Sequence, residues 1–232
     1  VRMMLRRNFH AVHMHRESAD VLGQVGQPRV IFLNHASWWD PLVMLLVSRM
    51  IFPQTIGFAP MEAVQMRRYA FFRWLGLFAV DSASRTAGRR FLRASEIVLN
   101  QRNAVLWLTP EARFVDVRER PVRFAPGLAH LAVRYPDSII APLAVEYTFG
   151  TEKLPEVYLR FGGALRGRDW GTSVGDAQEK LERALSDVQD LLSRQVILRQ
   201  KSDFRTLIEG DAGASRPYDM WRSIKAWLAG EK

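Results

Sequence analysis

Residues 30–41 read VIFLNHASWWDP, an apolar run followed by a short polar segment. The four consecutive apolar residues, 30–33, indicate a short buried strand. Asp40 precedes Pro41 and the apolar residues 42–47. This order predicts a helix with Asp40 as its N-cap and Pro41 as its first residue. The stretch is therefore expected to form a strand, a tight turn and a helix.

His35 and Asp40 flank this predicted turn. At this separation the carboxylate can accept a hydrogen bond from one imidazole nitrogen, which leaves the other nitrogen free as a base. Taken singly, a histidine at a strand end is often a packed residue, and an Asp before a Pro is ordinary helix capping. With Asn34 before the His and Pro41 after the Asp, the combination predicts a His-Asp dyad built from one loop.

Composition restricts the class of protein. The chain has 232 residues, 48% of them hydrophobic, which suits one domain with a sizeable core. It has no cysteine, which excludes disulfides, thiolate metal sites and a cysteine nucleophile. The formal net charge of +9 favours an anionic partner, whether nucleic acid, bilayer or phosphorylated substrate. No apolar run reaches the roughly 20 residues of a membrane span. Because residue 1 is Val, we leave open whether a start or an anchor precedes it.

Strands and helices are expected to alternate along the rest of the chain. Hydrophobic patterning predicts strands at 54–59, 78–80, 104–108, 139–145 and, as the last strand, 157–161, and helices at 61–75, 89–101, 128–134, 176–199 and 217–228. Residues 9–15 fit either a strand or a helix. Pro142 indicates an edge strand or a bulge. Residues 202–215 resemble a linker.

This alternation predicts an α/β fold with a mostly parallel central sheet flanked by helices. We expect a single domain over residues 1–200, in which the amphipathic helix 176–199 covers the sheet. Residues 201–232 are expected to form a linker and a short terminal helix packed on that domain. The polar residues 109–113 follow a buried strand, as the dyad does, and open parallel sheets bind ligands at such strand ends.

Several short blocks, in order, resemble the motifs of the glycerolipid acyltransferases, the family that includes lysophosphatidate acyltransferase. They are Asn34-His35 with Asp40-Pro41, then Gly76 to Asp81, Pro110-Glu111 with Arg113, Phe124 with Gly127, Ala141-Pro142-Leu143, and Phe161-Gly162. The resemblance extends from about residue 9 to residue 163. It is stronger than any single block because the order and the spacing are both kept.

The resemblance implies acyl transfer from acyl-CoA or acyl carrier protein to a lipid hydroxyl, first of all that of 1-acylglycerol-3-phosphate or another lysophospholipid. His35 would act as general base and Asp40 would orient it. The substrate-binding residues would be Asn34, Ser37, Asp81, Arg85, Glu111, Arg113 and Gly127. No cofactor and no metal are implied. The expected location is peripheral, at the cytoplasmic face of an anionic membrane.

Two departures from the family pattern concern the acceptor. Ser82 stands where the family usually has Arg after the Asp of its second motif, and Arg85 is the nearest substitute. The third motif usually reads Pro-Glu-Gly-Thr-Arg, whereas here Ala112 replaces Gly and Arg113 comes early. The family's arginines are associated with the acceptor's phosphate. An acceptor without a phosphate, such as a neutral lipid alcohol or a glycolipid, is therefore the alternative.

Three other interpretations have less support. Residues 171–175 match the Gly-x-Ser-x-Gly pattern of hydrolases, but no buried strand precedes them and no histidine follows Ser173. His10, His13 and His15 lack further ligands at a spacing that suits a metal. Seven arginines between residues 67 and 93, opposed only by Asp81, could contact nucleic acid, but no nucleic-acid motif accompanies them. Together with neighbouring aromatic residues, such as 71, 72 and 74, these arginines suit an anionic membrane surface equally well.

Overall fold

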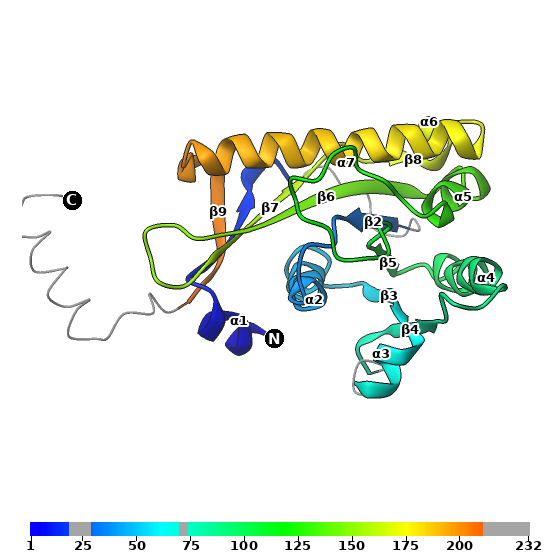
Figure 1. The fold of residues 1–232 in the computed structure, drawn as a ribbon, viewed down its shortest axis with the longest axis horizontal. Coiled ribbons are helices and arrows are strands. Elements are labelled where there is room, and N and C mark those ends of the chain that lie inside the picture. Colours follow the sequence, from blue (N-terminus) through cyan, green and yellow to red (C-terminus); the bar gives the residue numbers. More distant parts are fainter. Residues whose placement is uncertain (19–28, 70–73, 211–232) are drawn as a thin grey trace, which may run out of the picture.

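A computed structural model describes residues 1–18, 29–69 and 74–210 (Figure 1). The helices are α1 (Arg2–Asn8), α2 (Asp40–Ile51), α3 (Ala63–Arg68), α4 (Ala87–Leu99), α5 (Gly127–Arg134), α6 (Gly167–Trp170) and α7 (Val174–Ile197). The strands are β1 (Ala11–His15), β2 (Arg29–Leu33), β3 (Ile56–Glu62), β4 (Leu77–Val80), β5 (Ala104–Leu108), β6 (Ile139–Thr148), β7 (Glu156–Phe161), β8 (Leu165–Arg166) and β9 (Phe204–Glu209). The helix expected at 217–228 lies outside the described residues.

Within these ranges the strands form one nine-stranded sheet in the order β4-β3-β5-β2-β6-β7-β1-β9, with β8 paired to β6. Strands β4, β3, β5, β2 and β6 all run parallel to their neighbours in this series. Strand β7 is antiparallel to β6, and β9 is antiparallel to β1. The expected α/β fold with a mostly parallel sheet is confirmed. Because the five parallel strands end at one edge, the loops that follow them meet there.

Helices cover both faces of the sheet (Figure 1). The side chains of β2 show which helices cover each face, because neighbouring side chains of a strand point to opposite faces of the sheet. Val30 and Phe32 pack with α4, α5 and α7. Ile31 and Leu33 pack with α1 and α2 on the other face. A strand that is buried on both faces requires an unbroken apolar run, and residues 30–33 form such a run.

Two element boundaries differ from those predicted near the dyad. Helix α2 begins at Asp40 with Trp39 as its N-cap, one residue earlier than expected. The helix predicted over 61–75 is wrong at its start, since Met61 and Glu62 pair with β4 as the end of β3. Among the described residues of that range, the α-helix spans only Ala63–Arg68. Sheet pairing over-rides a pattern that is compatible with a helix.

The strands that follow residue 161 differ from the prediction. The strand at 157–161 is not the last, because β8 and β9 follow it. Strand β9 lies inside the predicted linker 202–215 and pairs with β1, which resolves residues 9–15 as a strand. Phe204, Leu207 and Ile208 are buried in this position. The six residues of β9 show no regular alternation of apolar and polar side chains, and their partner strand lies about 190 residues earlier in the sequence.

Pro142 lies in a central strand, so the edge-strand alternative of the prediction is wrong. Strand β6 stands between β2 and β7. Its antiparallel partners are β8 at Ile139 and Ile140, and β7 from Leu143 onward. Pro142 falls where one partner has ended and the other begins. The missing N–H therefore removes no ladder hydrogen bond on that side.

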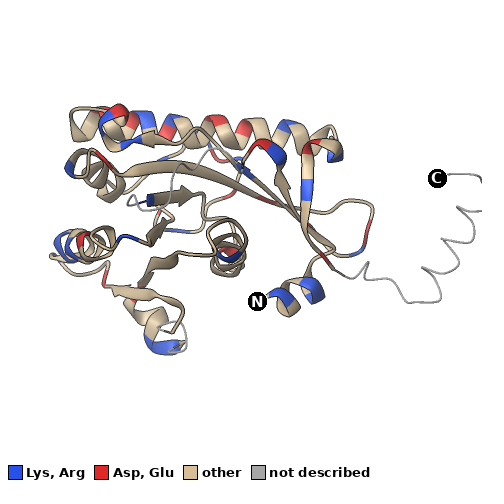
Figure 2. Cartoon of the chain, turned by 180° about the vertical axis from the view of Figure 1, so that it is seen from behind, with Lys and Arg blue, Asp and Glu red and all other residues tan. Residues whose placement is uncertain are grey.

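Charge is distributed unevenly over these elements. Helix α7 carries both signs along its length, whereas α1 and α3 carry arginines and no acidic residue (Figure 2). Among the helices of the described ranges, none has the length and apolar character that crossing a membrane requires. Helices α1, α3 and α4 thus have an excess of positive charge, whereas acidic residues outnumber basic ones in α7.

Candidate active site

The turn between β2 and α2 brings His35 and Asp40 together. The Nδ1 atom of His35 lies 2.7 Å from Oδ2 of Asp40. The same carboxylate oxygen accepts the backbone N–H of Ser37 at 3.0 Å. Asp40 is fully buried, whereas 22% of the His35 side chain is exposed. A buried carboxylate bound to Nδ1 fixes that proton and leaves Nε2 free as an acceptor, which is the geometry expected for a general base.

Tyr147, near the end of β6, holds the other oxygen of Asp40 and was not anticipated from the sequence. Its hydroxyl donates to Oδ1 of Asp40 at 2.6 Å. Burial, reinforced by the neighbouring carboxylate, raises the pKa of Tyr147 well above its usual value. The phenol therefore remains a hydrogen-bond donor. No local pattern around Tyr147 marks it, because the contact depends on the pairing of β2 with β6.

Asn34 and Glu111 brace the backbone of the turn. The side chain of Asn34 exchanges two hydrogen bonds of 2.9 Å with the backbone of Val145, one in each direction. Glu111, which follows β5, accepts the backbone N–H of His35 at 2.7 Å. Burial raises the pKa of Glu111, and this hydrogen bond partly opposes the rise. Both residues belong to the predicted site, and both fix the position of His35.

The loop after Glu111 lies against the imidazole ring. The ring of Phe114 stacks on that of His35 with 4.2 Å between centroids. Ala112 adopts the left-handed conformation with φ of 55°, the region in which a glycine costs nothing. A glycine, which the family pattern has at this position, would adopt this conformation without strain. The position of the motif's final Arg is occupied by Phe114.

A cavity of about 1030 Å³ opens beside His35. Its lining is predominantly apolar and comes from α2, β3, α3, β4, α4, β5 and α5, with Trp38, Met44, Phe58, Phe91, Trp107 and Leu108 among its members. Phe114 and Gly127 also line it. Apolar pockets with a few polar groups are typical of small-molecule sites, which measure about 300–1000 Å³. Nε2 of His35 is therefore the base available to a ligand held here.

Five of the seven predicted substrate-binding residues do not line this cavity, namely Asn34, Ser37, Asp81, Arg85 and Glu111. Asp81 and Arg85 are exposed and are not among its lining residues. The glycine of the same block has a structural role, because Gly76 has φ of 85° and a Cβ there would lie 2.2 Å from the carbonyl oxygen of Gly57. Gly127 likewise permits close packing, since its Cβ would lie 2.7 Å from the Phe91 ring.

Two cations of the described chain line the cavity, Arg68 and Arg113. Arg68 was not predicted as a site residue, and its guanidinium lies over the ring of Tyr69. Arg113 forms an ion pair with Glu119, and both side chains are about half exposed. Such exposed pairs contribute little and can be exchanged for an incoming anion. Within the described part of the chain, Glu62 is the one acidic residue of this lining, so the margin of the cavity keeps an excess of positive charge.

Comparison with known proteins identifies the family of this chain. The sequence model of the family described as Acyltransferase matches residues 6–146. This chain belongs to the acyltransferase family. The predicted glycerolipid acyltransferase resemblance is thereby confirmed. No curated protein sequence matches the chain.

A solved structure has a similar fold to this acyltransferase. It is the 1-acyl-sn-glycerophosphate (LPA) acyltransferase PlsC from Thermotoga maritima, with a TM-score of 0.50 and 15% sequence identity. The similarity covers 81% of this chain and 72% of that protein. At this identity the match concerns the fold, and it supports the arrangement of one mostly parallel sheet between helices.

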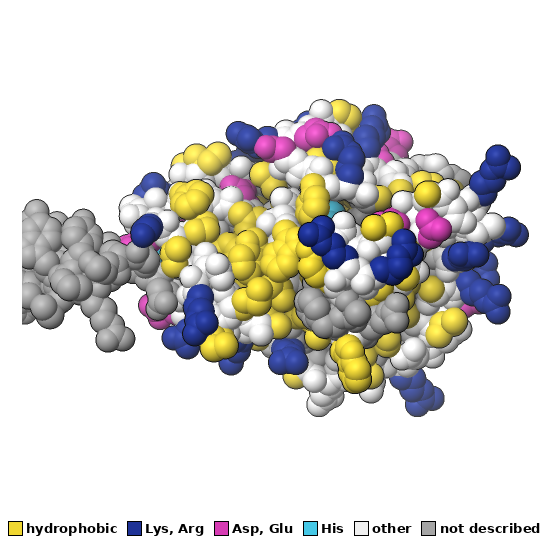
Figure 3. Space-filling view, turned by 60° about the horizontal axis from the view of Figure 1, so that its bottom comes forward, with side chains coloured by type: hydrophobic (Ala, Val, Ile, Leu, Met, Phe, Trp, Pro, Cys, Tyr) yellow, Lys and Arg dark blue, Asp and Glu magenta, His cyan; other side chains and the backbone are white. Residues whose placement is uncertain are grey.

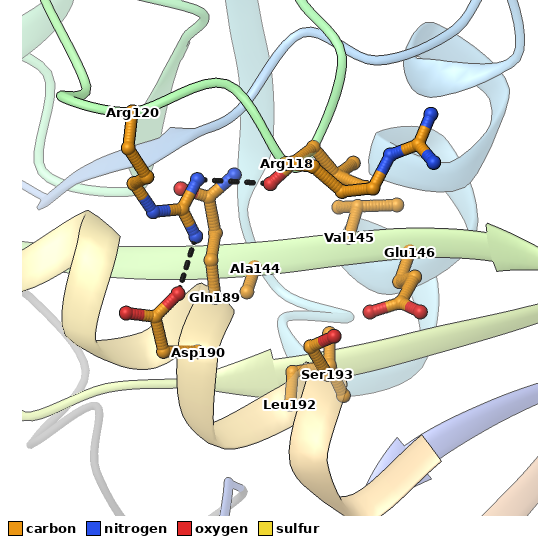
Figure 4. A pocket seen from close by; sticks show the side chains of 10 residues that line it. Arg118, Arg120, Ala144, Val145, Glu146, Gln189, Asp190, Leu192 and Ser193 are labelled. Atoms are coloured by element: carbon orange, nitrogen blue, oxygen red, sulfur yellow. Dashed lines mark hydrogen bonds and ion pairs between the residues drawn. The ribbon is translucent and has the colours of Figure 1, made fainter. Parts of the chain in front are cut away.

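A second, smaller hollow of this acyltransferase lies between residues 117–120, β6 and α7, and measures about 220 Å³ (Figure 4). Arg120 crosses it to pair with Asp190 of α7 and also donates to the carbonyl of Val117. The loop that carries Arg120 begins at Val115, whose N–H donates to the carbonyl of His35. The hollow thus results from a loop that ties the site to α7, and His35 does not line it.

The hydrolase pattern has a different role in this acyltransferase. Ser173 is the N-cap of α7, and its hydroxyl accepts the N–H of Asp176 at 3.1 Å. The residues before it form the short helix α6 and no buried strand. Residues 171–173 form a loop before a helix, as predicted, but Val174 and Gly175 already belong to α7.

Proposed function

We propose that this acyltransferase moves a fatty acyl group from an acyl thioester to a lipid hydroxyl, with His35 as general base and Asp40 as its orienting partner. The observation that carries the proposal is the 2.7 Å contact between His35 and a fully buried Asp40 at the margin of an apolar cavity. Acyl-CoA and acyl carrier protein are the two candidate donors. Their thioesters have the same reacting group.

The proposed reaction needs one base and no acyl-enzyme. Nε2 of His35 takes the proton of the acceptor hydroxyl while the oxygen attacks the thioester carbonyl carbon. The tetrahedral intermediate collapses, the carbon–sulfur bond breaks, and the thiolate receives the proton from His35. Asp40 stabilises the imidazolium between the two transfers. Base catalysis of this kind contributes about 10²–10⁴-fold, and holding both substrates in place supplies further acceleration.

We assign the apolar part of the cavity to the acyl chain and its positively charged margin to the acceptor. Lysophosphatidate or another lysophospholipid is our first choice of acceptor, with Arg68 and Arg113 in contact with its phosphate. The alternative is a lipid alcohol without a phosphate. It is favoured by Ser82 and Phe114, which stand where the family pattern has arginines.

We further propose that the protein binds the surface of an anionic membrane, with the cytoplasmic leaflet as the site. The face formed by α1, α2 and α3 shows a broad apolar surface with arginines around it (Figure 3). Exposed apolar side chains of these helices include Met3, Met50 and Val64. Trp38, which precedes α2, and Trp74, which is 91% exposed, are further exposed aromatic residues. Aromatic and basic side chains are favoured at a bilayer interface. A lipid acceptor could then reach the cavity without leaving the membrane.

Thiol release from acyl-CoA and from acyl carrier protein tests the reaction, with the acylated lipid identified by mass spectrometry. His35→Ala should lower kcat by at least about 10²-fold while circular dichroism stays unchanged. His10→Ala is the matched control, because His10 does not line the cavity. A folded His35→Ala protein that keeps its activity would contradict the dyad. Acylation of a neutral lipid alcohol, with lysophosphatidate ignored, would favour the alternative acceptor.

Vesicle flotation tests the membrane proposal. Binding to anionic vesicles should weaken with salt and in the double variant Arg67→Glu with Arg68→Glu, since each basic residue near such a surface contributes about 1 kcal/mol. The matched control is Lys180→Glu with Arg183→Glu, which changes the same charge on α7. Equal binding to neutral vesicles at every salt concentration would contradict the electrostatic part.

A further inference from the structure

The inner wall of the large cavity carries two polar groups that the proposed reaction does not use. Trp107 of β5 is 2% exposed, and within the described part of the chain its indole Nε1–H has no hydrogen-bond partner. Ser48 of α2 is 8% exposed. Both residues line the cavity. Native proteins seldom leave a buried N–H donor without an acceptor, so this one requires an explanation.

The two groups converge on one point beside Gly57. A Cβ built on Gly57 would lie 3.3 Å from Nε1 of Trp107 and 3.3 Å from Oγ of Ser48. Gly57 lines the cavity as Trp107 and Ser48 do, so the three residues surround one part of its wall. A ligand oxygen cannot occupy the Cβ position itself, which is one bond length from Cα. An oxygen in van der Waals contact with Gly57 on the cavity side would have both groups as its nearest polar neighbours, and hydrogen bonds to them need about 2.7–3.2 Å. Indole N–H only donates, so that atom must be an acceptor.

The register of the sheet gives the distance of this point from the base. Trp107 is paired with Ile31, and His35 follows Ile31 by four residues along the same direction. At about 3.3 Å per residue, the two positions are roughly 13 Å apart along the strands. An extended chain advances about 1.2 Å per bond, so this distance corresponds to roughly ten carbons. The point is therefore far from the reacting carbonyl and near the middle of a long acyl chain.

We propose that this point is an oxygen subsite and that the preferred acyl donors carry a hydroxyl or an oxo group near the middle of the chain. The inference rests on the proposed acyl transfer and on the acyl chain occupying the cavity. A hydroxyl would accept from Trp107 and donate to Ser48, and an oxo group would accept from both. A methylene group in this place would leave the indole N–H buried and unpaired.

Selectivity among three thioesters of equal chain length tests the proposal. One is saturated, one has a hydroxyl about ten carbons from the carbonyl, and one has it on the third carbon. The wild-type kcat/KM should be highest for the mid-chain hydroxyl, by about three- to tenfold over the saturated chain, as expected for one net hydrogen bond. The third-carbon hydroxyl should give no such advantage, because it lies near His35.

Two variants and a matched control sharpen the test. Trp107→Phe and Ser48→Ala should each remove most of the preference for the mid-chain hydroxyl, and the double variant should remove little more, because both groups bind the same oxygen. Trp170→Phe is the control. Trp170 is also buried and also lacks an acceptor for its Nε1–H within the described residues, but it does not line the cavity.

A preference that is absent from the wild type, or that is unchanged in both variants, would overturn the subsite. Turnover of none of the thioesters would instead contradict the proposed acyl transfer. In that event calorimetric titration with the free saturated and mid-chain hydroxy fatty acids decides the subsite separately, since binding needs no reaction. Tighter binding of the hydroxy acid that Ser48→Ala abolishes would support the subsite, and equal binding of both acids would exclude it.

Discussion

Two strand-to-helix turns of the same edge of the sheet, the one after β2 and the one after β4, both resemble family motifs and fold in opposite ways. After β2, the carboxylate of Asp40 is fully buried and accepts from the Nδ1–H of His35, the N–H of Ser37 and the hydroxyl of Tyr147. After β4, Asp81, Ser82 and Arg85 are exposed. The side chains of the first turn are fixed by contacts with β6 and with the loop after β5. In the second turn these three side chains are exposed to solvent.

The difference separates chemistry from acceptor recognition. A base must be held in one orientation, so each polar atom around Asp40 has a defined partner. Long charged side chains at an exposed turn have many conformations, and their position depends on the ligand. Gly76 matches the family's second motif for a structural reason, because a side chain at this position would collide with the backbone of Gly57. We therefore expect substitutions in the first turn to have much larger effects.

The largest effect should come from Asp40→Asn. An amide replaces one acceptor oxygen with a donor, so either Tyr147 or the pair of donors from His35 and Ser37 loses its acceptor. We expect kcat to fall by about 10³–10⁴-fold, comparable to the loss that the same exchange causes in a serine-protease triad. Steady-state kinetics on protein with an unchanged circular dichroism spectrum measures this. A loss below tenfold would remove Asp40 from the mechanism.

Tyr147→Phe should have an intermediate effect. It removes one hydrogen bond to Asp40 and leaves the His35 contact in place, so we expect kcat to fall about tenfold with little change in the acceptor KM. Tyr158→Phe is a matched control, because Tyr158 makes an equivalent bond to Glu156 outside the cavity. If both variants lose activity equally, the role of Tyr147 is in packing and not in positioning the dyad.

Arginine substitutions test whether the positively charged margin of the cavity binds the acceptor. Loss of one charge-assisted hydrogen bond costs about 1.5–3 kcal/mol, so Arg68→Ala and Arg113→Ala should each raise the KM for lysophosphatidate by about 10–150-fold. The donor KM should stay nearly constant. Arg85→Ala should change neither, since Arg85 does not line the cavity. A dominant effect of Arg85 would show that the second turn rearranges around the acceptor.

The smallest effect concerns stability at Glu111. Burial raises the pKa of this carboxyl, so its favourable contribution is present below the pKa of the unfolded chain and is lost as pH rises through the folded value. Glu111→Gln does not titrate and can still accept the N–H of His35. Its Tm relative to the wild type should therefore be higher at about pH 7 than at about pH 4. Glu179→Gln, on the exposed face of α7, should give no such trend.

Local sequence was sufficient wherever an element is determined by its own residues. The apolar run of β5 and the amphipathic helix α7 were predicted within two residues. The dyad was predicted because both members belong to one six-residue turn. Strand β9 was not predicted, because its extended conformation depends on pairing with β1, which is distant in the sequence. Arg68 was missed as a site residue because only packing brings α3 to the cavity.

The sequence by itself determined the α/β architecture, the His35–Asp40 turn and the order of the family motifs, because each depends on periodicity or on neighbours within a few residues. The tertiary structure alone decided that Tyr147 bonds Asp40, that Phe114 lies on His35, and which arginines line the cavity. These contacts join the carboxyl ends of separate strands. Their register is set by hydrogen bonding across the whole sheet, which no local pattern encodes.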